Sequence, residues 1–286
     1  MATQFKTLII EKRCYLSYEN GQIIIKTEDV EEAINLLNVH TILINIPFVS
    51  LSAYLINELA VRNIIIIFTD NKKIPSCEVV PYSFGYNKSK ALFKQLSFTE
   101  IARDTIWLTI LTYKIKNQIL LIKKLGLKKG CKLKKLLSNI SAKGVGNAEG
   151  LAARIYFKEL FGYKFTRRKE STINIALNYG YSLLASFITR TLIIHGYNTA
   201  LGIHHSSKSN PFNLTYDLIE PFRPYIDEIV YLNKNRNFDV EYKKLLISVL
   251  DRVTIYRNKK YKLLDLIEKF VIDTMHSLDK LSKVNE

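Results

Sequence analysis

Two adjacent histidines, several carboxylates and an arginine lie close together in residues 202–228, between segments that are otherwise apolar or basic. His205, Asp217 and Glu220 stand out. If Tyr216 to Glu220 is helical, Asp217 and Glu220 share a face, and His205 returns across the intervening loop. An imidazole nitrogen and carboxylate oxygens could then converge on a divalent cation, and this donor set favours Mg²⁺, Mn²⁺ or Zn²⁺.

The same residues have a second interpretation that involves no metal. Asn210-Pro211 followed by an Asp and a Glu is also a common way to begin a helix, with the acids facing the positive end of the helix dipole. Spacing alone leaves both interpretations open. A third, distant ligand would favour the metal.

Glu149 is a further acid with two interpretations. Gly144, Gly146 and Asn147 interrupt the preceding helix, and Glu149 then begins a new one with an apolar stripe. The segment GVGNAEG follows no evident strand and lacks the GK[ST] ending of a phosphate-binding loop. By position alone, Glu149 could be only a first-turn acid that complements the helix dipole.

The positive charge is confined to the second part of the chain. Residues 1–100 hold ten Lys and Arg against ten Asp and Glu, whereas residues 101–286 hold 32 against 16. A field of this size attracts polyanions, and counterion release from phosphates would provide much of the affinity. Nucleic acid is the favoured partner, although ribosomal attachment or an anionic lipid surface would require the same charge.

The densest basic run has seven lysines within residues 123–135. Such a run is usually a solvated face, but the absence of acids inside it favours contact with phosphates. The DNA-binding candidates are Lys123, Lys124, Lys128, Lys129, Lys132, Lys134, Lys135, Arg154, Arg167 and Arg168.

The pattern of residues predicts two domains with a boundary near residue 85. Short β-branched runs predict strands at Thr7–Ile10, Tyr15–Tyr18, Ile23–Lys26, Thr41–Ile46 and Ile64–Thr69, with a hairpin at Asn20-Gly21 and a helix within Ser50–Arg62. Pro75, Pro81 and residues 82–87 then predict a linker. Residues 1–85 are therefore expected to form a small β-rich domain with a structural or interface role.

Residues 86–286 have helical periodicity. Helices are expected at Leu92–Gln118, from Ser171 to Gly196, and at Leu263–Leu281, and the chain after Glu228 is expected to be helical throughout. Asn174, Asn178 and Tyr179 are polar exceptions in the apolar 171–196 helix, and we expect them to form hydrogen bonds within the core. The polar residues Lys114, Lys116, Asn117 and Gln118 could face a ligand, but a solvated surface is the default expectation.

Several classes of protein are disfavoured by the sequence. Cys14, Cys77 and Cys131 form no CxxC pair, which argues against a disulfide framework or a zinc ribbon. The N-terminus has no signal-peptide pattern, and no apolar run is long enough to span a bilayer. The expectation is a cytoplasmic protein with no membrane partner.

Three ordered motifs resemble those of the CRISPR-associated integrase, the Cas-one family that catalyses spacer acquisition. They are NAEG with ARIYF from Asn147 to Phe157, Asn174 with LNYGY from Leu177 to Tyr181, and GIHH from Gly202 to His205 with DLIEPFRP from Asp217 to Pro224. The chain is similar to the family over its full length. The segment HHSS…NPFNLTYDLIEPFRP most resembles the type II subtype, which accompanies a large single-protein effector nuclease.

The resemblance implies a fold and a site. It implies an α+β protein, with a β-sandwich-like N-terminal domain and a larger all-α catalytic and DNA-binding domain. It also implies that Glu149, His205 and Glu220 are catalytic and ligate Mg²⁺ or Mn²⁺, while Asp217 supports them. Further supporting positions are Arg223, Asn178 and Tyr179; Arg223 could orient Glu220 or Asp217, or contact phosphate.

The resemblance also implies an activity and partners. The expected function is a metal-dependent DNA endonuclease and integrase that inserts short foreign-derived duplexes into a CRISPR array by attack of a 3′-hydroxyl on a phosphodiester. The expected partners are double-stranded DNA, a second copy of the chain, and a small ferredoxin-like protein that completes a heterohexamer. Two alternatives remain: a basic DNA-binding scaffold without catalysis, and a stand-alone nuclease that cleaves branched DNA.

Overall fold

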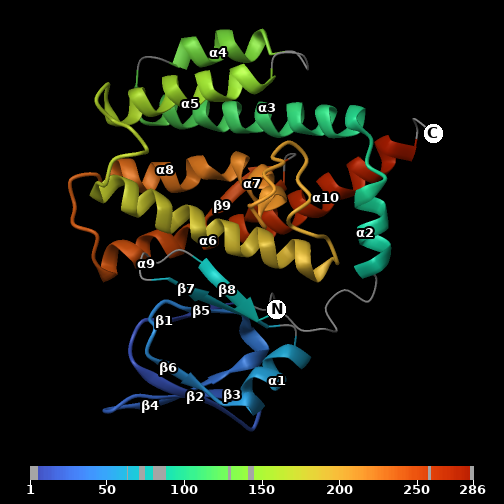
Figure 1. The fold of residues 1–286 in the computed structure, drawn as a ribbon. Coiled ribbons are helices and arrows are strands. Elements are labelled where there is room, and N and C mark those ends of the chain that lie inside the picture. The colour runs from blue at the N-terminus through green and yellow to red at the C-terminus, as the bar shows by residue number, and fades with distance from the viewer. Residues whose placement is uncertain are drawn as a thin grey trace. The chain divides into compact units, whose positions relative to one another are not determined.

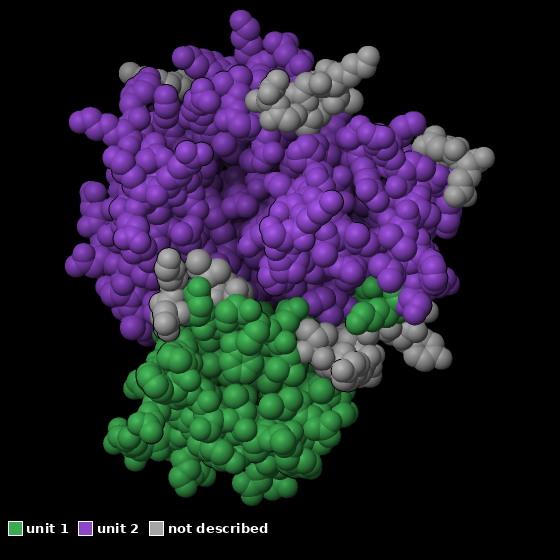
Figure 2. Space-filling view, viewed as in Figure 1, with its two compact units in different colours: residues 1–88, 194–196 green, residues 89–193, 197–286 purple. Residues whose placement is uncertain are grey.

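A strand-rich N-terminal part precedes a larger helical part, which confirms the predicted fold class (Figure 1). The computed structural model describes residues 6–62, 64–70, 75–79, 88–127, 130–140, 145–256 and 259–283. The chain divides into two compact units, residues 1–88 with 194–196 and residues 89–193 with 197–286 (Figure 2). No helix in the described ranges is long and apolar enough to cross a membrane.

The strand-rich unit contains two four-stranded sheets. One has the order β1 (Lys6–Ile10), β5 (Val39–Ile44), β7 (Ile65–Thr69) and β8 (Pro75–Val79), with β8 antiparallel to β7 and the other neighbours parallel. The other has the order β4 (Glu31–Asn35), β3 (Gln22–Lys26), β2 (Cys14–Glu19) and β6 (Val49–Leu51). Asn20 and Gly21 connect β2 to β3 with φ of 46° and 81°, the positive values that a two-residue hairpin turn requires.

Both sheets contribute to one apolar core. Leu16 and Ile23 come from the second sheet, Ile42 and Ile66 from the first, and Leu55 from helix α1 (Ala53–Val61), and all five are almost fully buried. Burial of each such side chain is worth about 1.5 to 3 kcal/mol. Two sheets that share a core give this unit its sandwich-like character.

Three strands of this unit were not expected from the sequence. Strand β4 is a largely exposed edge with the sequence EEAIN, and β6 has only three residues, so neither has the apolar alternation that identifies a strand. Strand β8 begins at Pro75, where a linker was predicted. A proline is compatible with the first residue of an edge strand, because its missing N–H is not needed there. The rest of the predicted linker, residues 80–87, lies outside the described residues.

The helical unit is built around a long helix, α3 (Glu100–Lys124), and a buried one, α6 (Thr172–Ile194). The segment Leu92–Gln118 is not one helix, because the Thr99 side chain caps α3 by accepting the N–H of Ala102 and separates it from α2. The remaining elements are α2 (Lys88–Leu96), α4 (Gly130–Ser138), α5 (Val145–Phe161), α7 (Asn213–Leu218), η3 (Glu220–Phe222), α8 (Arg223–Leu232), α9 (Val240–Ser248), η4 (Val249–Asp251), β9 (Val253–Tyr256), β10 (Lys259–Lys262) and α10 (Leu263–Lys283).

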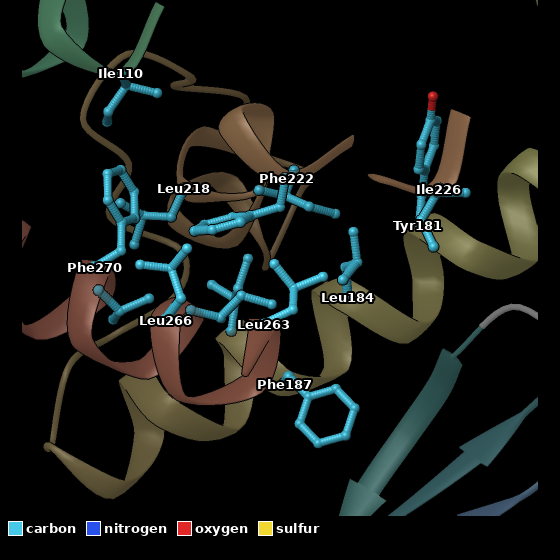
Figure 3. Packing of buried hydrophobic residues seen from close by; sticks show 14 of the residues in the cluster. Ile110, Tyr181, Leu184, Phe187, Leu218, Phe222, Ile226, Leu263, Leu266 and Phe270 are labelled. Atoms are coloured by element: carbon cyan, nitrogen blue, oxygen red, sulfur yellow. The ribbon is translucent and has the colours of Figure 1, made fainter. Parts of the chain in front are cut away.

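The core of the helical unit joins α3, α6, α7, α8 and α10 (Figure 3). Leu184 of α6, Leu218 of α7 and Phe270 of α10 belong to one buried cluster. Helices α6 and α8 approach closely at Gly180, where a Cβ atom would collide with the side chain of Ile226. This close approach places the helices that follow α6 at fixed positions beside it.

One part of this unit is not helical as predicted. Residues 253–262 were expected to continue the helical pattern, but β9 and β10 pair in an antiparallel hairpin. The run Val253, Thr254, Ile255 explains the difference, since β-branched side chains favour strands. The lysines of β10 had suggested only a basic helix.

Candidate active site

Asp217 lies at the end of α7 with no exposed surface and organises the loop that carries the histidines. Its Oδ2 accepts the backbone N–H groups of Ile203 at 2.6 Å and His204 at 3.0 Å, and its Oδ1 accepts that of His205 at 3.2 Å. His205 Nδ1 lies 2.6 Å from the same Oδ1. The carboxylate is thus fully used in holding the loop.

Gly202 makes this arrangement possible. A Cβ atom at this position would collide with the carbonyl oxygen of His205 and crowd the Asp217 carboxylate. Only glycine lets the loop close over the buried acid without a shift of the backbone.

The ring of His205 is oriented by Asp217 and by an aromatic neighbour. The hydrogen bond to Asp217 commits Nδ1 and leaves Nε2 as the nitrogen that can bind a ligand. Trp107 of α3 stacks on His204 with ring centroids 4.4 Å apart and meets His205 edge to face at 6.0 Å. The Asp217 hydrogen bond raises the pKa of His205 against the opposing effect of burial, and the charges of Asp217, Glu149 and Glu220 add to the rise.

Glu149 lies on the fifth residue of α5, so it is not a first-turn acid. Its Oε1 is 3.0 Å from the Lys114 ammonium of α3. The interpretation of Glu149 as a first-turn acid is therefore wrong, because α5 begins at Val145 and the carboxylate contacts a cation on another helix.

Glu220 begins η3 and is nearly buried between two cations. Its Oε2 lies 2.6 Å from Lys114 Nζ, and its Oε1 accepts Arg223 Nε at 2.8 Å. Burial would raise the pKa of Glu220, but Arg223 and Lys114 outweigh it and hold the pKa below its usual range. Arg223 was expected to orient Glu220 or Asp217, or to contact phosphate. In the structure it contacts Glu220.

Lys114 is the residue that joins these acids, and sequence reasoning missed it. Its side chain is only 7% exposed and its ammonium contacts both Glu149 and Glu220, so the expectation of a solvated surface is wrong for it. It is wrong for Gln118 as well, which is buried one turn further along α3, whereas Lys116 is exposed. The available signal was the position of Lys114 and Gln118 on the same helical stripe as Leu111 and Leu121.

Among the residues described, no three His, Cys, Asp or Glu side chains are close enough to form a metal-binding group. The two carboxylates nevertheless converge on one cationic position, which the Lys114 ammonium takes at 3.0 and 2.6 Å. Carboxylate oxygens and an imidazole nitrogen such as Nε2 of His205 are donors that Mg²⁺ and Mn²⁺ accept. The donor chemistry therefore fits a hard divalent cation, and occupation of this position would require the ammonium to withdraw.

A third buried acid lies near the site and was not singled out from the sequence. Asp227 of α8 accepts the hydroxyl of Tyr156 at 2.8 Å and that of Tyr181 at a shorter separation. Burial raises the pKa of Asp227 to about 6, although the two tyrosines, Arg223 and Arg167 act in the opposite direction. The signal was present, since Asp227 lies within residues 202–228 and Tyr181 within the LNYGY motif.

The polar residues of α6 differ in position from one another. Asn174 is buried as expected, and its amide donates to the carbonyl oxygens of Thr166 and Lys169. Asn178 is exposed, contrary to expectation, and accepts Arg167 Nη2 at 2.6 Å. Tyr179 packs its ring edge to face against Phe238. The supporting role predicted for Asn178 and Tyr179 remains a prediction.

The basic candidates are spread over three helices and a loop. Lys123 and Lys124 end α3, Lys132, Lys134 and Lys135 lie exposed on α4, and Arg154 lies exposed on α5. Lys124 is paired with Glu228 of α8 at 2.5 Å. Lys128 and Lys129 fall outside the described residues.

The two neighbouring arginines before α6 have different surroundings. Arg168 is exposed, whereas Arg167 is half-buried and binds the side-chain oxygens of Asn174 and Asn178. Residue type and position alone did not distinguish these two arginines.

Comparison with known proteins gives a consistent result over nearly the whole chain. The sequence model of the family described as CRISPR associated protein Cas1 matches residues 7–247. A CRISPR-associated endonuclease Cas1 from Neisseria meningitidis serogroup C (strain 8013) is 31% identical over 273 residues, which cover 93% of this chain and 90% of the relative.

Solved structures share the fold at low sequence identity. A Cas1 protein from Thermotoga maritima has a TM-score of 0.79 at 17% identity, covering 96% of this chain and 97% of its own. A casposase bound to an integration product has a TM-score of 0.77 at 19% sequence identity, and the match covers 96% of this chain and 91% of the casposase chain. A chain of a Cas6-RT-Cas1–Cas2 complex has a TM-score of 0.76 at 18% sequence identity, and the match covers 98% of this chain and 36% of the chain in that complex. These matches name no subtype, so the type II resemblance remains a prediction.

Proposed function

The chain belongs to the Cas1 family of CRISPR-associated proteins, and on that premise we propose that it inserts short DNA duplexes into a CRISPR array. The reaction would be the attack of a DNA 3′-hydroxyl on a phosphodiester, carried out in residues 86–286. The observation that supports this most directly is the convergence of Glu149 and Glu220, from separate parts of the helical unit, on one cationic position.

Glu149, Glu220 and the Nε2 of His205 would hold a Mg²⁺ or Mn²⁺ ion. When bound, such an ion supplies electrostatic stabilisation for the charge that develops on phosphodiester oxygens. Transesterification of this kind needs no nucleophile from the protein, because the DNA supplies the hydroxyl. The task of the chain is therefore to place donors and to bind two strands.

The remaining residues of the site would position these donors. Asp217 fixes the His205 ring through Nδ1 and the loop through three N–H groups. Arg223 holds Oε1 of Glu220 and so limits the rotation of that carboxylate. The exposed lysines of α4 would contact DNA phosphates and reduce the repulsion between two DNA segments.

The names of similar structures support the choice of partners. One is a casposase bound to an integration product and another is a Cas6-RT-Cas1–Cas2 complex. We extend both to this chain: its substrates are the incoming duplex and the repeat-bearing target, and its protein partner is a small Cas2-type subunit with a ferredoxin-like fold. The chain would act as a homodimer within a heterohexamer, with residues 1–85 in an interface role.

A strand-transfer assay tests the proposed function. The wild-type protein, with its small partner and Mn²⁺, should join a fluorescent duplex to a repeat-bearing plasmid, and EDTA should abolish joining. Glu149→Gln should lose joining by about a thousandfold while still binding the duplex, because it removes a ligand charge and keeps the size of the side chain. Joining that persists in Glu149→Gln would refute the assignment.

The two alternative functions, a DNA-binding scaffold and a stand-alone nuclease, would give different results in the same experiments. A scaffold would bind the duplex, show no Mn²⁺ binding that is lost in His205→Ala, and join nothing. A stand-alone nuclease would cleave branched DNA without joining, because water would take the place of the 3′-hydroxyl. Product analysis on a sequencing gel separates joining from cleavage.

A further inference from the structure

A small polar cavity opens beside Glu220, and Arg167 joins Lys114 and Arg223 in its wall. Its volume is about 170 Å³, and its polar wall consists of Lys114, Gln118, Arg167, Glu220, Arg223 and Asp227, with Tyr181 also lining it. Three of these side chains are cationic. Of the two acids, Glu220 is already bound by Lys114 and Arg223, and Asp227 accepts the hydroxyls of Tyr156 and Tyr181.

Arg167 has no carboxylate partner among the residues that the structure describes. Its guanidinium is bound instead by two neutral amide oxygens, Asn174 Oδ1 and Asn178 Oδ1, each at 2.6 Å. Burial lowers the pKa of Arg167 and the nearby Arg223 lowers it further, while Tyr181 and Asp227 act in the opposite direction. Among the described contacts, the guanidinium is therefore held in place by neutral amides and not by a carboxylate.

The two arginines are held against the same aromatic ring. The guanidinium carbon of Arg223 lies 4.5 Å from the centroid of Tyr181, and that of Arg167 lies 5.3 Å from it. Tyr181 is anchored in turn by its hydroxyl on Asp227. Two like charges on a fixed ring repel each other, and an anion in the cavity would relieve that repulsion.

Gln118 supplies a further polar group without a partner. It is 3% exposed, and its Oε1 has no hydrogen-bond partner in the described part of the chain. Amide oxygen and nitrogen are assigned from the surrounding hydrogen bonds, so the terminal NH₂ can be turned toward the same position. A buried amide of this kind is normally satisfied, which indicates that the cavity accommodates a polar ligand.

We propose that this cavity is a subsite for one phosphate of a DNA strand, adjacent to the phosphodiester that reacts at Glu149 and Glu220. Guanidinium groups bind phosphate through paired N–H donors, and both Nη atoms of Arg223 are distinct from the Nε that binds Glu220. Because Lys114 and Glu220 belong to the wall of the cavity, the bound phosphate would hold the strand in register with the acids. The assignment rests on the function proposed above.

Duplexes with single methylphosphonates test the subsite. Each duplex has one neutral methylphosphonate in place of a phosphate near a 3′ end, and binding is measured by fluorescence anisotropy in EDTA. For the wild-type protein, one position should weaken binding by about tenfold, the effect of losing one charge-assisted contact. Arg167→Gln should weaken binding to the unmodified duplex by a similar factor, and that same methylphosphonate should then have no further effect.

Arg168→Gln is the matched control, since Arg168 is the exposed neighbour of Arg167. It should weaken binding by a smaller factor and retain the full effect of the critical methylphosphonate. If Arg167→Gln behaves like Arg168→Gln, or if all methylphosphonate positions weaken wild-type binding equally, the subsite is refuted. The scan of wild-type protein does not depend on the folding of a variant, and a thermal melt checks each variant.

Inorganic phosphate distinguishes a strand phosphate from a free anion. A strand subsite should show the position-dependent effect, with phosphate competing only weakly. Thermal protection by inorganic phosphate that is lost in Arg167→Gln, without a position-dependent effect, would assign the cavity to a free anion and overturn the proposal. Binding in EDTA involves no strand joining, so failure of the subsite and failure of the proposed function give separate results.

Discussion

Two neighbouring regions of the helical unit stabilise buried acids by different means. Asp217 is held by three backbone N–H groups and an imidazole, all of which are fixed by the loop at residues 203–205. Glu149 and Glu220 are held by the flexible side chain of Lys114, with Arg223 on the far oxygen of Glu220. Backbone donors cannot withdraw without unfolding the loop, whereas an ammonium on a four-carbon chain can be replaced by another cation.

This difference assigns separate tasks to acids that look alike in the sequence. The Asp217 region is built for rigidity, because every acceptor site of its carboxylate is used. The Lys114 region is built for exchange, because its carboxylates remain together only while some cation neutralises them.

The largest effect is expected for Asp217→Asn. The three N–H groups would lose a charged acceptor, and the free energy of unfolding should fall by about 3 to 5 kcal/mol. Urea denaturation in EDTA measures the loss. Mn²⁺ should not restore stability, because no cation can replace an acceptor of N–H groups. A loss below about 1 kcal/mol would show that the loop does not depend on this acid.

Lys114→Met should give the next largest effect, with the opposite response to metal. In EDTA, Glu149 would lack a cation and Glu220 would keep only Arg223, so the free energy of unfolding should fall by about 3 kcal/mol. Millimolar Mn²⁺ should recover most of this, and Mn²⁺ should bind more tightly than to wild type because it no longer competes with the ammonium. Calorimetric melts and electron paramagnetic resonance of free Mn²⁺ provide the measurements.

Arg103→Met is a control for that experiment, since Arg103 lies on α3 three turns before Lys114 and contacts neither carboxylate among the described interactions. It should leave Mn²⁺ affinity unchanged. Equal Mn²⁺ affinity in wild type and Lys114→Met would mean that the two cations do not share a position, and the comparison between the two regions would fail.

Asp227 extends the comparison to an acid held by neutral hydroxyls. The pKa of Asp227 is about 6 in the folded protein, above its ordinary value of 3.8. Between these two pH values the folded state therefore retains a proton that the unfolded state has released. Stability from this group is present at low pH and is lost as the pH rises from about 4 to about 6, by about 3 kcal/mol in total. Asp227→Asn should remove that part of the pH dependence.

The check on Asp227 is the difference between two denaturation series. Unfolding free energies of wild type and Asp227→Asn, measured across this pH range, should diverge as the pH rises, with the variant losing less. Parallel curves would show that Asp227 keeps an ordinary pKa and that the tyrosines stabilise its charged form fully.

The smallest effect on stability is expected on α4. Replacing Lys132, Lys134 and Lys135 together by Gln should change the free energy of unfolding by less than about 0.5 kcal/mol, because all three are exposed. The slope of log affinity for DNA against log salt should fall by about 0.9 for each lysine that contacts phosphate. Lys116→Gln, exposed on α3, is the control, and an unchanged slope in the triple variant would remove α4 from the DNA-binding surface.

Much of the fold could be predicted because local patterns and tertiary structure agree. The Asn20-Gly21 turn requires positive φ, Ser171 begins the long helix by accepting the N–H of Asn174, and the stripe of α10 from Leu266 to Leu278 is buried. Predictions failed where the pattern was weak or ambiguous. An exposed edge such as β4 has no apolar alternation, and the lysines of β10 have the composition of a solvated helix.

The sequence by itself determined the family through its three ordered motifs, the division into strand-rich and helical parts, and the confinement of excess positive charge to residues 101–286. These properties follow from residue type and order. Only the tertiary structure decided which polar side chains meet. It separated Arg167 from Arg168, made Asp217 a support for the loop, and placed Lys114 between Glu149 and Glu220. The reason is physical: the contacts of a side chain depend on which helix faces pack together, and residues 114, 149 and 220 are too far apart in the chain for local spacing to specify their meeting.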